Sequence, residues 1–217
     1  MSPTSLLKAT LCALTITIHA GVFAQVKSDA WYPGKIELID DHIYDVELRY
    51  VFTRMEGLLQ VREFDEVVTL SPIKVKSFEF YDAIRDEHRR FVSVSSFMEH
   101  VQYRKKLFIE VLYDGNEISL LRRTDSFGAM PTESLYLMDH QTQNILPYAV
   151  SKYSRKNSSV YINADTKLLY QLTYKHKREL RDYVSRNSLK LKKPEDIITL
   201  LVYFDQLANL SVKDSSQ

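Results

Sequence analysis

The sequence has few of the residues on which many functional sites depend. A single cysteine, Cys12, occurs among the 217 residues, which excludes an intramolecular disulfide framework. The five glycines are too few and too scattered for a glycine-rich phosphate loop. The G-x-S-x-G and H-E-x-x-H motifs of hydrolases are missing. The six histidines occur singly, without the spacing of a helical metal site. We therefore assign no catalytic, cofactor-binding or metal-ligating residue, and expect no cofactor.

The sequence also has no large excess of positive or negative charge. Lysine and arginine total 29 and aspartate and glutamate total 28, so the overall charge does not indicate a nucleic-acid partner. Hydrophobic residues make up 45% of the chain and charged residues 26%, which is typical of a folded globular protein.

Residues 1–24 have the pattern of an export signal. Lys8 supplies a positive charge, residues 9–18 form an apolar run, and Ala24 is a small residue at the expected cleavage point. The run is shorter than the roughly 20 residues of a membrane-spanning helix, so no transmembrane segment is expected after cleavage. We predict cleavage near Ala24 and a periplasmic or secreted protein that contains no thiol.

Residues 25–150 have the pattern of a β-rich domain. Apolar residues alternate strictly from Tyr44 to Phe52, the period of a half-buried strand. A change of parity at Ser77 indicates a bulge. The pair Asp114-Gly115 lies between two β-rich segments and predicts a tight hairpin with positive φ values. Nine or ten short strands predict an antiparallel sheet curled into a roll or a barrel-like shape.

The apolar period changes to three and four residues after a polar connector at 151–163. Residues 164–210 predict a helical region, in which Asp165 caps a first helix, Asn187 ends it and Pro194 begins the last one. Residues 211–217 are polar and predict a frayed tail. The expected fold class is therefore α+β, an antiparallel β-roll or barrel-like sheet followed by two or three C-terminal helices.

The two parts of the chain differ in charge. Residues 25–150 hold 15 basic and 21 acidic side chains, whereas residues 151–217 hold 13 basic and 7 acidic ones. One interpretation is a solvated helical surface that docks against the acidic sheet. The other is a cationic face that contacts an anionic polymer or lipid headgroups. The residues of this candidate face are Lys175, Lys177, Arg178, Arg181, Arg186, Lys190, Lys192 and Lys193.

Aromatic residues form a second candidate contact set. Tyrosine combines an apolar ring with a polar tip and is favoured in protein interfaces and grooves, although its preference for strands gives an equally simple explanation. The candidate partner contacts, with a protein or an envelope glycan, are Trp31, Tyr32, Tyr103 and Tyr153. Tyr148 and Tyr161 also lie where a core does not require them.

Two acidic segments contain groups that could do chemistry. Asp40, Asp41, His42, Asp45 and Glu47 offer oxygen ligands for calcium but lack the spacing of an EF-hand, so we expect an acidic hairpin turn. The run from Asp86 to Arg90 could supply an acid–base pair but is more simply a solvated turn between strands.

Several segments together resemble a group of proteins. They are Pro33–Leu38, Val75–Phe80, the hairpin Leu107–Leu121 and the helical segment Leu180–Asp205. With these segments the chain resembles uncharacterised exported bacterial envelope proteins that have a β-rich front and a short helical tail. The resemblance implies a fold and a periplasmic setting, and it implies no activity.

Three functions are compatible with these observations. The first is a non-enzymatic envelope protein that acts through surface contacts with a protein or glycan. The second is a hydrolase of an envelope polymer, which needs two carboxylates about 5–10 Å apart across a groove; the candidates are Asp86 with Glu87 and Asp45 with Glu47. The third is a barrel that binds a lipid-like ligand, which an interior filled by the protein's own phenylalanine and leucine side chains would exclude.

Overall fold

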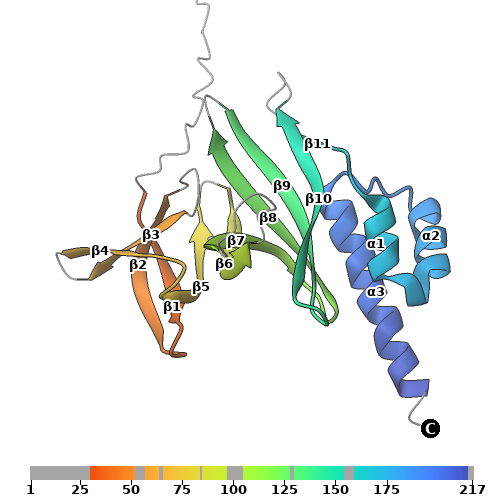
Figure 1. Ribbon diagram of the computed structural model, residues 1–217, viewed down its shortest axis with the longest axis horizontal. Helices are drawn as coiled ribbons and strands as arrows, with labels where there is room; N and C mark the ends of the chain where they lie inside the picture. Colours follow the sequence, from red (N-terminus) through yellow and green to blue (C-terminus); the bar gives the residue numbers. More distant parts are fainter. Residues whose placement is uncertain are drawn as a thin grey trace, which may run out of the picture.

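The computed structural model describes residues 30–51, 57–63, 66–83, 85–96, 105–127, 130–153 and 159–214. Within them, one antiparallel sheet of eleven strands is followed by three α-helices and a short 3-10 helix (Figure 1). The predicted α+β class, with the sheet first and the helices last, is confirmed. The predicted signal peptide lies outside the described residues.

The elements follow one another along the chain as short strands and then helices. The strands are β1 (Tyr32–Leu38), β2 (Ile43–Val51), β3 (Leu58–Glu63), β4 (Glu66–Leu70), β5 (Val75–Asp82), β6 (Glu87–Ser96), β7 (Lys105–Asp114), β8 (Ile118–Phe127), β9 (Met130–Asp139), β10 (Asn144–Tyr153) and β11 (Ser159–Ile162). The helices are α1 (Thr166–Leu172), the 3-10 helix η1 (Tyr174–His176), α2 (Lys177–Arg186) and α3 (Pro194–Asp214).

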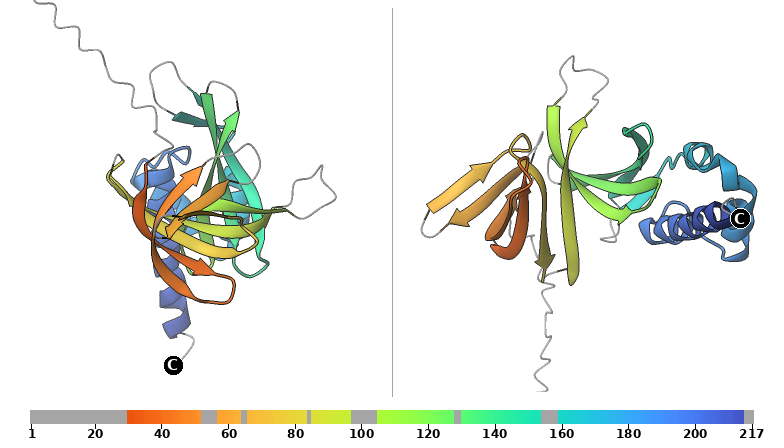
Figure 2. Two further views of the ribbon diagram at one scale, coloured as in Figure 1. Left: turned by 90° about the vertical axis from the view of Figure 1, so that its left-hand side faces the viewer. Right: turned by 90° about the horizontal axis from the view of Figure 1, so that it is seen from below.

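The sheet is two meanders joined side by side. Strand β1 pairs with β2 on one side and with β5 on the other, which gives the order β11-β10-β9-β8-β7-β6-β5-β1-β2-β3-β4. The two outermost strands, β4 and β11, do not pair with each other, so the sheet is strongly curved but open. Figure 2 shows the helices at one end of the molecule and β1–β4 at the opposite end.

One face of this sheet, which we name the inner face, carries most of the core. Residues that lie directly opposite each other on neighbouring strands share a face. The register pairs Phe78 with Phe91, Phe91 with Glu110, Glu110 with Arg122, and Arg122 with Leu135. A continuous row of inner-face positions therefore runs from β5 to β9.

An aromatic cluster fills the inner face over β1–β7. The rings of Phe78 and Phe91 stack with centroids 4.7 Å apart, and Phe108 meets Phe78 edge-on at 5.0 Å. Tyr50 of β2 also reaches Phe91, at 4.8 Å, because the curved sheet brings β2 over β6. The buried members are Ile36, Leu48, Leu59, Val61, Val75, Phe78, Phe80, Phe91 and Phe108.

The helices pack on the inner face at the other end of the sheet. Strand residues such as Leu120 and Leu137 are fully buried there against Leu180 of α2 and Phe204 of α3. The Tyr148 hydroxyl of β10 donates a hydrogen bond to the Leu191 carbonyl at 2.8 Å, which attaches the α2–α3 connection to the sheet. This helix-side cluster is the larger of the two inner-face clusters and fixes the position of α2.

The sequence predicts one helix between Asp165 and Asn187, but the structure divides it at Thr173. The Thr173 hydroxyl is buried and donates to the Leu169 carbonyl at 2.9 Å, which ends α1, and the chain then turns through η1 into α2. Threonine that bonds back to the preceding turn in this way bends a helix. The predicted cap at Asp165, the end at Asn187 and the start of the last helix at Pro194 are confirmed.

The turn between β7 and β8 differs from the tight hairpin with positive φ that Asp114-Gly115 predicts. None of residues 114–117 has a positive φ. Gly115 is required for a different reason, because a Cβ there would lie 2.5 Å from the Ile118 carbonyl oxygen and 2.8 Å from Asp205 Oδ2. Helix α3 thus presses its Asp205 carboxylate against this turn.

The sheet also extends into the range 151–163, for which the sequence predicts a connector. Strand β10 continues to Tyr153, and β11 pairs with it through Ser151 opposite Tyr161. Both residues are buried, and the Ser151 hydroxyl accepts a hydrogen bond from the Glu133 backbone N–H at 2.8 Å. Polar residues here serve strand pairing, so their polarity does not mark a linker. Similarly, α3 continues to Asp214 within the predicted frayed tail.

Candidate anion-contact surface and adjoining groove

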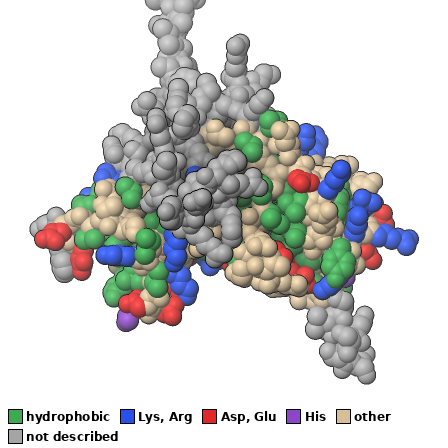
Figure 3. All heavy atoms as spheres, viewed as in Figure 1, with side chains coloured by type: hydrophobic (Ala, Val, Ile, Leu, Met, Phe, Trp, Pro, Cys, Tyr) green, Lys and Arg blue, Asp and Glu red, His purple; other side chains and the backbone are tan. Residues whose placement is uncertain are grey.

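The eight predicted basic residues lie in one short region of the structure, and all of them are exposed. Figure 3 shows lysine and arginine side chains gathered at the helical end of the molecule. We name this set the basic face. Its members come from η1, from α2 and from the α2–α3 connection: Lys175, Lys177, Arg178, Arg181, Arg186, Lys190, Lys192 and Lys193.

The amphipathic pattern of α2 places its cations toward solvent. Leu180 is fully buried in the helix-side cluster, and Tyr183 and Val184 pack partly against it, so the remaining positions of the helix point outward. The Arg181 guanidinium lies over the Tyr170 ring, 5.1 Å from its centroid. Beside the basic residues, Tyr174 of η1 is 69% exposed.

Backbone hydrogen bonds shape the connection that carries the last three lysines. The Leu189 N–H donates to the Val184 carbonyl at 3.0 Å, which closes the end of α2. The Lys190 N–H donates to Asp196 Oδ2 at 2.8 Å, so this carboxylate holds the connection at the first turn of α3. The lysine side chains are therefore presented by an ordered loop.

No ion pair joins any member of the basic face to another described residue. The sheet is different, because several of its basic residues are paired. Arg62 lies 2.9 Å from Glu47, and Arg90 lies 2.8 Å from Asp114. One interpretation of the sequence is a solvated helical surface that docks against the acidic sheet; the helices do pack on the sheet, through apolar side chains, and no ion pair joins the basic face to a described residue of the sheet. Among the described residues, the basic face therefore has no anionic partner.

A groove of about 920 Å³ adjoins the basic face. Three lysines of the basic face, Lys190, Lys192 and Lys193, line the groove. The other lining residues come from the sheet, from the start of α1, from the last turn of α2, from the α2–α3 connection and from the first turn of α3: Arg122, Glu133, Tyr161, Thr166, Val184, Leu189, Leu191, Pro194 and Glu195. The groove thus combines apolar and cationic lining residues.

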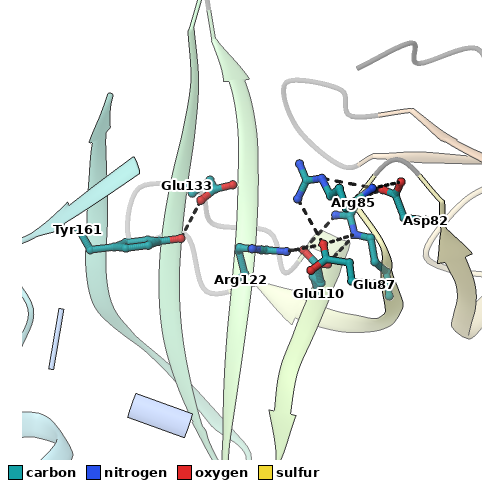
Figure 4. Close-up of polar contacts among 8 residues, drawn as sticks. Asp82, Arg85, Glu87, Glu110, Arg122, Glu133 and Tyr161 are labelled. Atoms are coloured by element: carbon teal, nitrogen blue, oxygen red, sulfur yellow. Dashed lines mark hydrogen bonds and ion pairs between the residues drawn. The ribbon is translucent and has the colours of Figure 1, made fainter. Parts of the chain in front are cut away.

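Tyr161 and Glu133 form a hydrogen-bonded pair in this groove. The Tyr161 hydroxyl donates to Glu133 Oε2 at 2.7 Å (Figure 4). Burial, followed by the neighbouring Glu133 carboxylate, raises the pKa of Tyr161 well above its ordinary value, so the phenol stays protonated and continues to donate. Burial acts to lower the pKa of the Arg122 guanidinium, but its hydrogen bond to Glu110 outweighs this and raises that pKa, and the nearby Glu133 carboxylate adds to the rise.

A buried set of charges, which we name the ionic belt, lies beside the groove on the inner face. Arg89 donates to both oxygens of Glu110, from Nε to Oε1 at 2.7 Å and from Nη2 to Oε2 at 3.1 Å. Arg122 Nε donates to Glu110 Oε2 at 2.9 Å (Figure 4). Arg89 Nη1 donates to Asp82 Oδ2 at 3.3 Å. Oε1 of Glu87 lies 3.6 Å from Arg122 Nη2 without a hydrogen bond.

The ionic belt holds its central carboxylate in the charged form. Burial acts to raise the pKa of Glu110, but hydrogen bonds from Arg89 and Arg122 outweigh it and leave that pKa below its ordinary value. Both carboxylate oxygens are occupied by guanidinium donors. A general acid or base needs a proton site that a substrate can reach, so this geometry is typical of a structural ion-pair network.

The structure separates the two carboxylates of the first hydrolase candidate. Glu87 lies on the inner face in the ionic belt, whereas Asp86 is exposed in the turn before β6 and accepts a hydrogen bond from the Tyr81 hydroxyl. Asp86 also has a left-handed backbone with φ 56°. The two groups therefore do not face each other across a groove.

Asp45 and Glu47 share one exposed face of β2, because they are two residues apart on a strand. They line a surface depression of about 680 Å³ together with Glu79 and His88. Glu47 is ion-paired with Arg62.

The predicted calcium alternative involves the same corner of the sheet. Within the described ranges, no group of three or more His, Asp or Glu side chains is arranged to hold a metal ion. Asp40 instead pairs with His42 at 3.2 Å, and Asp41 pairs with Lys76 at 2.8 Å.

The predicted aromatic contacts have different surroundings. Trp31 is half-buried between Arg62 and Arg49, at 4.3 and 5.0 Å from the guanidinium carbons. Tyr32 is half-buried against Phe80, with centroids 4.9 Å apart. Tyr103 and the side chain of Tyr153 lie outside the described residues.

Tyr148 and Tyr161 belong to the core, although the sequence suggested that the core does not require them. Both are buried in the helix-side cluster, with 1% and 4% exposure. The hydrogen bonds of their hydroxyls explain how two phenols are accommodated there.

Sequence reasoning missed the ionic belt and the groove. A usable signal for the belt was the parity of Glu110, which shares its face of β7 with buried Phe108. An inward-facing charge of this kind predicts a partner on a neighbouring strand. The groove had no comparable signal, because its residues come from six elements and from the α2–α3 connection.

None of the helices in the described part of the chain is long and apolar enough to span a membrane. Comparison with protein-family models, curated proteins and solved structures gave no match for the chain.

Proposed function

We propose that the protein is an exported, non-enzymatic envelope component that contacts an anionic surface through its basic face. The proposal is supported by one observation above all: eight exposed cations occupy one short helical region and have no ion pair with another described residue. The proposed export rests on the sequence of residues 1–24 alone.

The energetics favour such a contact without a specific pocket. Each lysine or arginine near an anionic bilayer contributes about 1 kcal/mol, and the attraction fades within a Debye length. Exposed charges gain little from isolated surface ion pairs, so the clustering of cations is more informative than any one of them. Tyr174, exposed beside Lys175 and Lys177, has the amphipathic side chain that is enriched at membrane–water interfaces.

A vesicle-binding measurement tests this proposal. We expect the purified protein to sediment with vesicles that contain phosphatidylglycerol but not with pure phosphatidylcholine vesicles. Because the Debye length falls from about 10 Å at 0.1 M salt to about 3 Å at 1 M, binding should be lost at high salt.

Matched charge reversals locate the contact. The double variant Lys177→Glu/Arg178→Glu should lower vesicle binding at least about tenfold, since it removes two cations and adds two repelling anions. The control Lys35→Glu/Lys74→Glu makes the same change in net charge at exposed positions of the sheet region and should bind nearly as the unaltered protein does. Equal losses in both variants, or binding that ignores salt, would contradict the proposal.

A further inference from the structure

The groove beside the basic face has the size of a small-molecule site. Its volume of about 920 Å³ lies within the range of roughly 300–1,000 Å³ that is common for ligand pockets. It lies between the inner face of the sheet and the α2–α3 connection, and the hydrogen bond from Tyr148 to the Leu191 carbonyl fixes that connection in place. The groove is therefore formed by packed elements.

The walls of the groove suit a hydrocarbon chain. Val184, Leu189, Leu191 and Pro194 contribute aliphatic surface, and Tyr161 also lines the groove. Leu191 is 9% exposed, whereas Val184 and Leu189 are only partly buried by the helix-side cluster. The apolar surface that remains exposed in the groove favours an apolar occupant over water.

The charges of the groove select the sign of a polar head. The Glu133 carboxylate is occupied by the Tyr161 hydroxyl, and its charge is opposed by Arg122. Lys190, Lys192 and Lys193 are exposed and have no ion pair with any described residue. Four cations line the groove against two carboxylates, so an anionic head on the lysine side is favoured.

We propose that this groove binds a single-chain amphiphile with an anionic head, its chain along Val184, Leu189 and Leu191 and its head at Lys192 and Lys193. A fatty acid and a lysophospholipid share this chemistry. The inference goes beyond the proposed surface contact, since it concerns one bound molecule in solution.

Calorimetric titration of the purified protein below the micelle concentration tests the site. The probes are decanoate and dodecanoate for a carboxylate head, lysophosphatidylglycerol for a phosphate head, and dodecanol as a neutral chain. Each added methylene should tighten binding by about threefold to fourfold if the chain is buried. Dodecanol should bind at least about tenfold more weakly than dodecanoate. The preferred head distinguishes a free fatty acid from a lysolipid as the source.

Two kinds of variant distinguish the contribution of the anionic head to binding from that of the hydrocarbon chain. Lys192→Gln/Lys193→Gln should weaken dodecanoate binding by about tenfold and leave dodecanol binding unchanged. Leu189→Trp should fill the groove and abolish both, and Val184→Phe should do the same from a second lining position, in case Leu189→Trp fails to fold. The control Val68→Phe changes an exposed residue of β4, in the outermost strand of the sheet, and should bind as the unaltered protein.

Amphiphile binding in the groove and vesicle binding by the basic face can be tested independently. Lys177 and Arg178 do not line the groove, so Lys177→Glu/Arg178→Glu should lose vesicles but keep dodecanoate. Leu189→Trp should show the reverse. Affinity that does not depend on chain length, equal affinity for dodecanol, or unchanged binding in both wall variants would overturn the inference.

Discussion

Glu110 is a carboxylate on a sheet face that otherwise carries mostly rings and aliphatic side chains. Its charge is tolerated because Arg89 and Arg122 supply three hydrogen bonds to its two oxygens. The Arg89 guanidinium in turn lies over the Phe91 ring, 5.1 Å from its centroid. Removal of one partner from such a buried set leaves uncompensated charge, which costs more than the intact pair contributes.

Replacement of Glu110 should therefore destabilise the protein strongly. We expect Glu110→Gln to lower the free energy of unfolding by about 3–5 kcal/mol, because two buried guanidinium groups lose their anionic partner. Urea unfolding at neutral pH measures this loss. Glu63→Gln, at an exposed position of β3, is the control and should change stability by less than about 0.5 kcal/mol. A loss below about 1 kcal/mol in Glu110→Gln would contradict the structural role of the belt.

The pH dependence of the same residue follows from its lowered pKa. A carboxyl group whose pKa is lower in the folded than in the unfolded chain stabilises the fold above its unfolded pKa of about 4.3. That contribution is lost as pH falls through the folded pKa. The difference in unfolding free energy between the protein and Glu110→Gln should accordingly shrink as the pH is lowered below about 4.3.

At the scale of the element, the sequence predicted most helix boundaries and missed the contacts between elements. Asp165 acts through its side chain, which accepts a hydrogen bond from the Leu168 N–H, and Pro194 acts through its own ring, so local chemistry is sufficient to place them. The break at Thr173 depends on the burial of its hydroxyl, and the conformation at Gly115 depends on the approach of Asp205, which is 90 residues away. Neither environment can be deduced from neighbouring residues.

Asp205 should couple α3 to the β7–β8 turn. Its Oδ2 accepts from the Tyr113 hydroxyl at 2.7 Å and from the Asn116 N–H at 3.1 Å. We expect Asp205→Ala to lower the free energy of unfolding by about 1–3 kcal/mol, since both donors lose their acceptor. Amide hydrogen exchange at Asn116 should also accelerate. Gln206→Ala, at the next and exposed position, is the control, and unchanged exchange at Asn116 in Asp205→Ala would refute the coupling.

At the scale of the whole molecule, the inner face of one sheet carries two apolar clusters and a belt of charge that touches both, and a third, smaller cluster of Leu107, Ile109 and Leu121 lies on the other face. Arg89 lies over a ring of the aromatic cluster, and Arg122 is paired in register with Leu135 of the helix-side cluster. The fold class could be predicted from alternation and period, but this continuity could not, because it depends on strand order. The groove also depends on the strand order, because the lining residues from β8, β9, β11 and α1 come close together only in the folded chain.

The continuity of the sheet predicts a single cooperative unfolding transition. Trp31 is the only tryptophan and lies beside β1, whereas the helices lie at the opposite end of the molecule (Figure 2). Tryptophan fluorescence and the helical circular dichroism signal should therefore give the same denaturation midpoint. Separate midpoints would show that the sheet and the helices unfold as independent units.

The separation of charge along the chain gives the folded molecule an electrical polarity. The helical end carries the excess of lysine and arginine, and the sheet carries the excess of carboxylates. The net charge of the chain is only +1, so the attraction of the whole molecule to an anionic surface is weak. The dominant long-range effect is the torque that the field of this surface exerts on the dipole formed by the two oppositely charged ends. The molecule should rotate before it makes contact, and it should arrive with its helices leading and β4 trailing.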